Sequence, residues 1–177
     1  SDYETDYDSI NKKISKIYGI ELDEENFSKT INNIEVFISE YSFINAKPNI
    51  LNEDALLYNN NEIKWSYIIG NPPYFVCKKT DIPKKYHDFC TGRPNIFGLF
   101  IIHALSMLNS NGILAFVIPN SFLNSAYYAV IRNYIKKICN IVEIIDFKNN
   151  NEFIDTDQAT FGLVLQKLDA EVEPTEC

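Results

Sequence analysis

The sequence predicts an α/β protein built on a doubly wound, mostly parallel sheet with an antiparallel terminal strand. Short apolar runs alternate along the chain with longer segments of helical periodicity, the pattern of strands joined by crossover helices. Most of the runs are apolar at every position, as is typical of strands that are covered on both faces. The 177 residues, 46% of them hydrophobic, are enough for one such domain.

The first third of the chain carries two strand candidates and one clear helix. Residues 10–17 indicate the last turns of a helix, and residues 16–22 form a strand candidate. The acidic residues 23–25 favour the start of a helix, because its positive dipole end attracts carboxylates. The apolar stripe of this helix recurs at spacings of four and three, at Phe27, Ile31, Ile34, Ile38 and Tyr41. Residues 49–51 are a brief strand candidate, and residues 55–64 are a short helix or a loop.

The middle of the chain is organised around a strand at residues 66–70. We expect this strand to be buried and to end at the next residues, because two prolines have no N–H for a strand ladder. Residues 75–95 form a long connection, a kind of segment that is usually functional or disordered. Residues 96–108 are apolar almost all round and predict a buried helix, which the polar residues 109–112 end.

The last third completes the alternation. Residues 113–118 predict a buried strand that ends at Pro119, and Asn124 or Ser125 is the expected cap of a further helix. Two more strands are expected, at residues 141–147 and 161–168.

Composition limits the classes of function. The net charge of −8 argues against a surface devoted to nucleic acid, so any phosphate contact must be local. No apolar run approaches the roughly 18 residues of a membrane span, and a signal peptide is not evident, so we expect a cytoplasmic protein with no membrane partner. The scattered cysteines predict reduced thiols rather than a zinc site or a disulfide framework, and they are Cys77, Cys90, Cys139 and Cys177.

The turn Asn71-Pro72-Pro73-Tyr74 offers chemistry at the carboxyl end of a strand, the edge at which open α/β sheets bind ligands. The amide oxygen of Asn71 and the carbonyl of Pro72 are acceptors, and neither proline has a competing N–H, so the turn is suited to hold an NH₂ group. When two acceptors hold the hydrogens of an amine that is conjugated with a ring, they bias its nitrogen towards the tetrahedral geometry that it needs to act as a nucleophile. Tyr74 adds a face on which a planar base can stack, a contact worth about 1–3 kcal/mol.

Asn71 to Tyr74, placed after an apolar strand, resemble the catalytic motif of N6-adenine DNA methyltransferases. Residues 95–100, residues 113–123 and Arg132 extend the resemblance to the methylase domain of type II restriction-modification enzymes of the gamma class. The resemblance covers roughly residues 17–168. It implies a Rossmann-like, S-adenosylmethionine-dependent methyltransferase fold.

The resemblance also implies a domain organisation and a cofactor site. Residues 1–168 would be the catalytic domain and residues 169–177 a polar tail. S-adenosylmethionine would be held by Glu21 on its ribose hydroxyls and by Asp54 on its adenine amine. The side chains of Ile20 and Ala55 would flank the adenine ring of this cofactor.

For the substrate, the resemblance implies double-stranded DNA with a flipped-out adenine, whose N6 is otherwise paired. Asn71 and Pro72 would hold N6, Tyr74 would stack on the base, and Phe153 would pack against its other side or its edge. Methyl transfer would be a direct displacement assisted mainly by positioning. The candidate phosphate contacts lie in the long basic connection, at Lys78, Lys79, Lys84, Lys85 and Arg93.

Other interpretations remain open at this point. Glu21 and Asp54 could be acids that favour helix starts, Phe153 could anchor a loop, and the basic connection could be merely solvated. The same turn occurs in protein-glutamine and some ribosomal RNA methyltransferases, and a methylase-like module without catalysis could bind DNA or serve in assembly.

The glycines do not supply the turn on which the methionine end of the cofactor should lie. None of the six forms a G-x-G pair. We therefore expect the sequence to be a piece of a longer protein, without the first strand and its glycine-rich turn and without a C-terminal target-recognition domain. The whole protein would add a restriction or specificity domain, and the piece alone should bind S-adenosylmethionine poorly.

Overall fold

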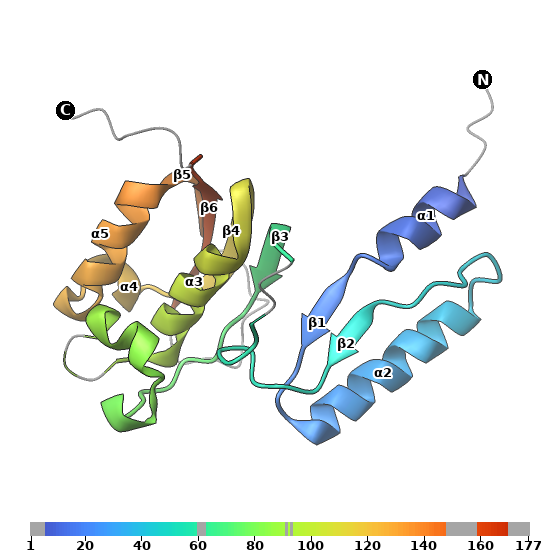
Figure 1. Cartoon of the computed structure of the whole chain (residues 1–177), viewed down its shortest axis with the longest axis horizontal. Coiled ribbons are helices and arrows are strands. Elements are labelled where there is room, and N and C mark those ends of the chain that lie inside the picture. Colours follow the sequence, from blue (N-terminus) through green and yellow to red (C-terminus); the bar gives the residue numbers. More distant parts are fainter. Residues whose placement is uncertain (1–5, 60–62, 91, 93, 148–158, 170–177) are drawn as a thin grey trace. The chain divides into compact units, whose positions relative to one another are not determined.

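The computed structural model describes residues 6–59, 63–90, 92, 94–147 and 159–169. These residues form two compact units, Ser1–Asn59 and Asn60–Cys177 (Figure 1).

The first unit contains two helices and a two-stranded sheet. Its elements are α1 (Tyr7–Ile14), β1 (Tyr18–Ile20), α2 (Glu24–Ser39) and β2 (Asn49–Leu51). β1 and β2 pair in parallel, with Gly19 opposite Ile50. The strand–helix–strand order predicted for this region is confirmed.

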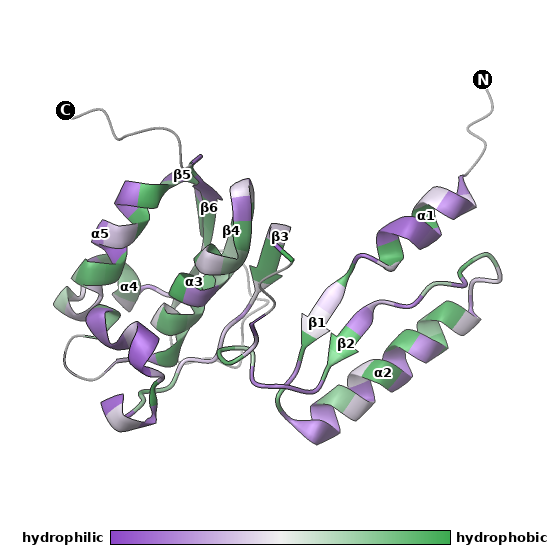
Figure 2. Cartoon of the chain, viewed as in Figure 1, coloured by the Kyte–Doolittle hydropathy of each residue, from purple (hydrophilic) through white to green (hydrophobic). Residues whose placement is uncertain are grey.

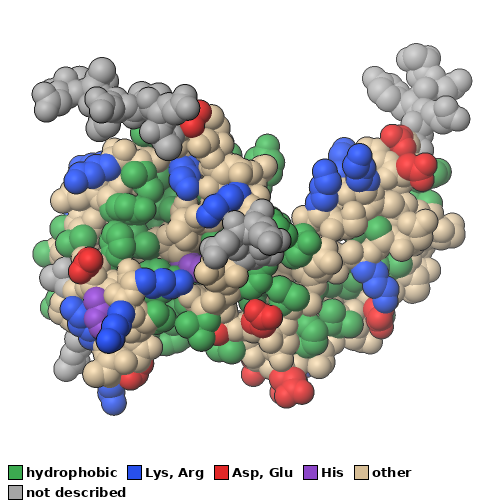
Figure 3. All heavy atoms as spheres, viewed as in Figure 1, with side chains coloured by type: hydrophobic (Ala, Val, Ile, Leu, Met, Phe, Trp, Pro, Cys, Tyr) green, Lys and Arg blue, Asp and Glu red, His purple; other side chains and the backbone are tan. Residues whose placement is uncertain are grey.

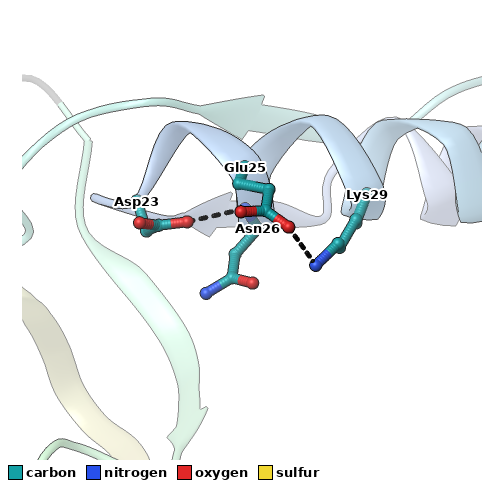
Figure 4. A network of polar contacts seen from close by, with 4 residues as sticks. All are labelled: Asp23, Glu25, Asn26 and Lys29. Carbon is teal, nitrogen blue, oxygen red and sulfur yellow. Dashed lines mark hydrogen bonds and ion pairs between the residues drawn. The ribbon is translucent and has the colours of Figure 1, made fainter.

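The start of α2 is stabilised by side chains on its first turns (Figure 4). The carboxylate of Asp23 accepts a hydrogen bond from the backbone N–H of Asn26 at 2.8 Å, which satisfies one of the N–H groups that a helix start leaves open. Glu25 forms an ion pair with Lys29 at 2.6 Å, one helical turn further on. The acidic residues therefore mark the helix start, as predicted.

The second unit is a four-stranded mixed sheet with its helices. The strands are β3 (Trp65–Gly70), β4 (Leu108–Pro119), β5 (Cys139–Asp146) and β6 (Thr160–Lys167). Their order in the sheet is β3-β4-β6-β5. β3 is parallel to β4, and β6 is antiparallel to both of its neighbours. The antiparallel terminal strand is thus confirmed, and it lies between β4 and β5.

In the described part of this unit, two longer helices and four short ones connect the strands. The described helical segments of the second unit are η1 (Lys79–Asp81), η2 (Lys84–Phe89), α3 (Ile96–Met107), α4 (Ser121–Asn124), η3 (Ala126–Tyr128) and α5 (Ala129–Ile138). Of the two predicted cap residues, Ser125 caps η3, because its hydroxyl accepts a hydrogen bond from the N–H of Tyr127. The main helix, α5, follows η3 directly and has no side-chain cap at its first residue. Among the helices of the described residues, none is long and apolar enough to cross a membrane.

The core of the second unit lies between its sheet and α3, which is hydrophobic along most of its length (Figure 2). The largest fully buried side chains come from α3, β4 and β6: Phe97, Leu99, Ile101, Leu105, Leu108, Leu114, Ile118, Pro119 and Leu165. This packing fixes the carboxyl ends of β3 and β4 relative to the start of α3.

The prediction that the strands are buried on both faces is wrong for the two edge strands. In β3, Tyr67 is 78% exposed and Ile69 is 85% exposed. Every residue of β5 after Cys139 is also exposed. For β3, the reason is that α3 and α5 lie on one side of this sheet (Figure 1), so they leave the face that carries Tyr67 and Ile69 uncovered. The strand at residues 66–70 exists as predicted, but it is not buried.

The junction of α3 and β4 also differs from the prediction. Residues 109–112 were expected to separate a helix from a strand, but β4 begins at Leu108, directly after α3. Asn111 adopts a left-handed backbone conformation with φ of 61°. A Cβ on Gly112 would lie 3.0 Å from the carbonyl of Asn109 and 3.1 Å from that of Trp65. A glycine therefore avoids crowding of two backbone carbonyls where the chain passes close to β3.

The described thiols are free. Cys77, Cys90 and Cys139 form no disulfide, and Cys177 lies outside the described residues. Burial raises the pKa of Cys139 to about 11, so this thiol is protonated at neutral pH. A protonated, buried thiol is a poor nucleophile, which makes Cys139 a core residue rather than a reactive one.

We expect Lys167→Met to destabilise the second unit. The Nζ of Lys167 donates to the carbonyls of Leu105 and Leu108 at 2.9 Å each, where the end of α3 leaves carbonyls open. Hydrogen bonds to a charged group contribute about 1.5–3 kcal/mol, so a loss of about 2 kcal/mol in the free energy of unfolding is expected in urea titrations. Lys136→Met, on the exposed side of α5, is the matched control and should change the free energy of unfolding by less than about 0.5 kcal/mol. Equal effects of the two variants would contradict this role.

Candidate active site

The turn Asn71-Pro72-Pro73-Tyr74 lies at the carboxyl end of β3, as predicted. The last residue of β3, Gly70, pairs with Phe116 of β4. Pro72 is buried, which anchors the turn, whereas Asn71 and Pro73 are exposed. The amide of Asn71 is therefore held at the end of the sheet with access to solvent.

The side chain of Tyr74 connects this turn to β4. Its hydroxyl donates to Oδ1 of Asn71 at 2.5 Å and lies 2.8 Å from the carbonyl oxygen of Val117. Burial raises the pKa of Tyr74, so the hydroxyl keeps its proton across the neutral range. Two of the predicted catalytic residues, Asn71 and Tyr74, are thus in direct contact.

The ring of Tyr74 packs against a cluster of buried and half-buried aromatic side chains. The ring of Tyr74 meets Phe97 edge to face, with ring centres 6.2 Å apart and an interplanar angle of 90°. Phe97 is fully buried and in turn contacts Phe122 at 6.0 Å and Tyr128 at 5.0 Å. Arg132 secures the turn after β4 by donating to the carbonyl of Phe122 at 2.7 Å.

The contribution of Val117 could not be assigned from residue type, because its backbone carbonyl carries the contact. The register of the parallel strands β3 and β4 explains this contact. Gly70 pairs with Phe116, so Val117 is the residue of β4 that lies beside the turn. Phe97 and Arg132 belong to segments that carry the family resemblance, but their supporting roles come from the contacts above.

The long connection of residues 75–95 begins and ends beside the turn. The N–H of Cys77 donates to the carbonyl of Pro94 at 2.8 Å, and the N–H of Ile96 donates to the carbonyl of Phe75 at 2.9 Å. The side chain of Asn95 caps α3. The two ends of the connection are therefore fastened beside the turn, at the start of α3.

The middle of the connection is anchored in the core. Tyr86 of η2 is 3% exposed, and its hydroxyl lies 2.6 Å from Nδ1 of His103 in α3. His103, 5% exposed, is thus a core residue that packs this connection rather than a catalytic base.

The predicted basic contacts lie on the surface of this connection. Lys78, Lys79, Lys84 and Lys85 are all exposed, and Nζ of Lys85 lies 4.8 Å from the ring centre of Tyr86. Figure 3 shows Lys and Arg side chains gathered on the lower left of the visible face. Arg93 lies outside the described residues.

The two predicted cofactor acids lie in the first unit, at the ends of neighbouring parallel strands. Glu21 follows β1, and Asp54 comes three residues after β2. One oxygen of Glu21 accepts from the N–H of Asp23 at 2.9 Å, and one oxygen of Asp54 accepts from the N–H of Leu56 at 2.9 Å. Asn52 bonds the carbonyl of Glu21 at 2.8 Å and so links the two strand ends.

This donor set fits a nucleoside. Within the described residues, the second oxygen of each carboxylate has no hydrogen-bond partner and remains able to accept from ribose hydroxyls or an amine. Ile20 and Ala55 are half-buried beside the two acids. Asp23 is the cap residue of α2, and Glu21 accepts from its backbone N–H through one oxygen only. The remaining predicted residue, Phe153, lies outside the described residues.

Comparisons with known proteins match this chain to restriction-modification methylases. The family model described as Eco57I restriction-modification methylase matches residues 2–153. The modification methylase CviBIII of Paramecium bursaria Chlorella virus NC1A is 30% identical over 156 residues, which are 86% of this chain and 37% of that protein. The type II methyltransferase M.AccI of Acinetobacter calcoaceticus is 32% identical over 145 residues, which are 67% of this chain and 25% of that protein.

A solved structure shows the same fold. A class I S-adenosylmethionine-dependent methyltransferase of Listeria monocytogenes superposes with a TM-score of 0.70 at 20% identity, over 90% of this chain and 47% of that one. The fold is therefore that of class I methyltransferases, and the chain spans well under half the length of the two sequence relatives. Because the family model matches most of its length, the chain belongs to the Eco57I restriction-modification methylase family.

Proposed function

We propose that this chain is the catalytic part of a DNA methyltransferase that methylates N6 of adenine in a restriction-modification system. The observation that carries the proposal is the exposed amide of Asn71, held by Tyr74 at the end of β3. Membership of a restriction-modification methylase family supports the choice of DNA as substrate.

In the proposed mechanism, the turn activates a weak nucleophile by positioning it. The amide oxygen of Asn71 and the carbonyl of Pro72 accept the two hydrogens of the exocyclic amine, which draws the nitrogen lone pair out of conjugation with the ring. The target adenine must leave the duplex, because its N6 is otherwise paired. The ring of Tyr74 stacks on the extruded base, and Phe153 packs on its other side.

S-adenosylmethionine, when bound, supplies the electrophilic methyl group. Glu21 would accept from its ribose hydroxyls and Asp54 from its adenine amine, with Ile20 and Ala55 flanking the ring. The exposed lysines of the connection and Arg93 would contact DNA phosphates, which gives binding that weakens as salt rises. A restriction or specificity domain in the whole protein is the proposed partner for choosing the DNA sequence.

The class of substrate is tested by measuring which kind of macromolecule receives the methyl label. The complete gene product is incubated with methyl-labelled S-adenosylmethionine and with unmethylated DNA, RNA and protein in separate reactions. We expect label in DNA alone. Label in RNA or protein would favour another amine substrate, and saturable DNA binding without transfer would favour a non-catalytic module.

We expect Glu21→Ala to weaken binding of S-adenosylmethionine. Hydrogen bonds to a charged acceptor contribute about 1.5–3 kcal/mol, so the dissociation constant should rise by about 10- to 100-fold in calorimetric titration of the complete gene product. Glu25→Ala is the matched control, because Glu25 is on the first turn of α2 and pairs with exposed Lys29. Unchanged affinity in Glu21→Ala, or an equal loss in both variants, would remove Glu21 from the site.

A further inference from the structure

The exposed amide of Asn71 needs a group that holds it in place. Asn71 follows the last residue of β3 and is exposed, and its side chain would otherwise rotate in solvent. A hydrogen-bond acceptor that must meet one particular amine loses much of its effect when it samples several orientations. Among the hydrogen bonds of the described residues, the bond from Tyr74 is the one that fixes this amide.

The hydroxyl of Tyr74 is itself fixed by the sheet and the core. It lies 2.8 Å from the carbonyl oxygen of Val117 in β4, and the tyrosine ring meets buried Phe97 edge to face. The position of the hydroxyl therefore depends on β4 and α3, the rigid elements of the unit.

We infer that the Tyr74 hydroxyl is a positioning group that holds the amide oxygen of Asn71 in place for methyl transfer. The inference deepens the proposed function and rests on it. The hydroxyl would act through Asn71, whereas the proposed stacking on the base belongs to the tyrosine ring. The two roles of one side chain are thus separable.

The arrangement leaves Asn71 able to accept from the substrate. An amide oxygen has two lone pairs, so a bond from Tyr74 leaves one for the amine of the target base. The hydroxyl has one hydrogen and two acceptors in reach, Oδ1 of Asn71 and the carbonyl of Val117. The hydrogen that points to Oδ1 keeps this oxygen in place while the amine binds, and the contact with Val117 locates the hydroxyl beside β4.

Tyr74→Phe tests the inference, because phenylalanine keeps the ring and removes only the hydroxyl. In the complete gene product, we expect the single-turnover rate of methyl transfer to fall by about 10- to 100-fold, the range for a misplaced catalytic group. Total label is counted, so the comparison does not depend on which base is methylated. Affinity for DNA should stay within about threefold, because stacking by the ring is retained.

Tyr128→Phe is the matched control. Tyr128 packs against the same Phe97 and loses a hydroxyl in the same way, but that hydroxyl interacts with Ser121 rather than with Asn71. Its rate should stay within about threefold of the wild type, because the ring that packs on Phe97 is kept and the lost hydroxyl does not hold Asn71. A wild-type rate in Tyr74→Phe, or equal losses of rate in the two variants, would overturn the inference.

A measurement without catalysis separates this inference from the proposed function. The side-chain amide of Asn71 is observed by NMR in the wild type and in Tyr74→Phe. We expect a restricted amide in the wild type and a mobile one in the variant. Equal mobility would refute the positioning role even if the protein methylated nothing, whereas the absence of methyl transfer with a restricted amide would refute only the proposed function.

Discussion

Asn71→Ala is expected to lower the rate of methyl transfer by at least about 100-fold, the usual effect of removing one preorganised group beside the reacting atoms. The substitution deletes the side-chain acceptor that Tyr74 holds at 2.5 Å and leaves only the carbonyl of Pro72 for the amine. Because Asn71 is exposed at the end of β3, folding should be unaffected. The measurement is the single-turnover rate in the complete gene product.

Asn124→Ala is the control for this substitution. Asn124 is an exposed asparagine at the end of α4, so the same atoms are removed outside the turn. Its rate should lie within about threefold of the wild type, as is usual for exposed positions. A rate for Asn71→Ala that matches this control would mean that the turn does not take part in the reaction.

Phe97→Ala is expected to have the largest effect on stability. Phe97 is fully buried and contacts three other rings, those of Tyr74, Phe122 and Tyr128. Truncating a buried phenylalanine costs about 3–5 kcal/mol through lost burial and the cavity that remains. Urea titration should show this loss, and activity should fall as well, because the ring that fixes Tyr74 is gone.

Phe75→Ala provides the comparison, since Phe75 is 53% exposed immediately after the turn. Its free energy of unfolding should change by less than about 0.5 kcal/mol, the usual range for surface substitutions. A loss below about 1 kcal/mol in Phe97→Ala would show that the aromatic cluster does not stabilise the unit.

Local signals in the sequence were sufficient for most elements. The stripe of α2, the end of β3 at two prolines and the cap at Ser125 each depend on residues close together in the chain, so their physical basis is visible without a structure. The turn that carries Asn71 and Tyr74 was predicted for the same reason.

Burial and long-range contacts were not accessible in the same way. Tyr67 and Ile69 are apolar enough for a buried strand, and only the arrangement of helices on the sheet shows that they are exposed. The contact of Tyr74 with Val117 joins positions 43 residues apart through a backbone atom, which residue types cannot reveal. Glu21 and Asp54 are 33 positions apart in the chain, and it is the parallel pairing of β1 and β2 that brings them to the same edge of the sheet.

The identity of the methylated base tests the central claim most directly. Unmethylated DNA is treated with the complete gene product and methyl-labelled S-adenosylmethionine, digested to nucleosides and separated by chromatography. The proposed function predicts that all label elutes as N6-methyldeoxyadenosine. Label in a cytosine nucleoside would contradict the account, because the turn would then serve a different base.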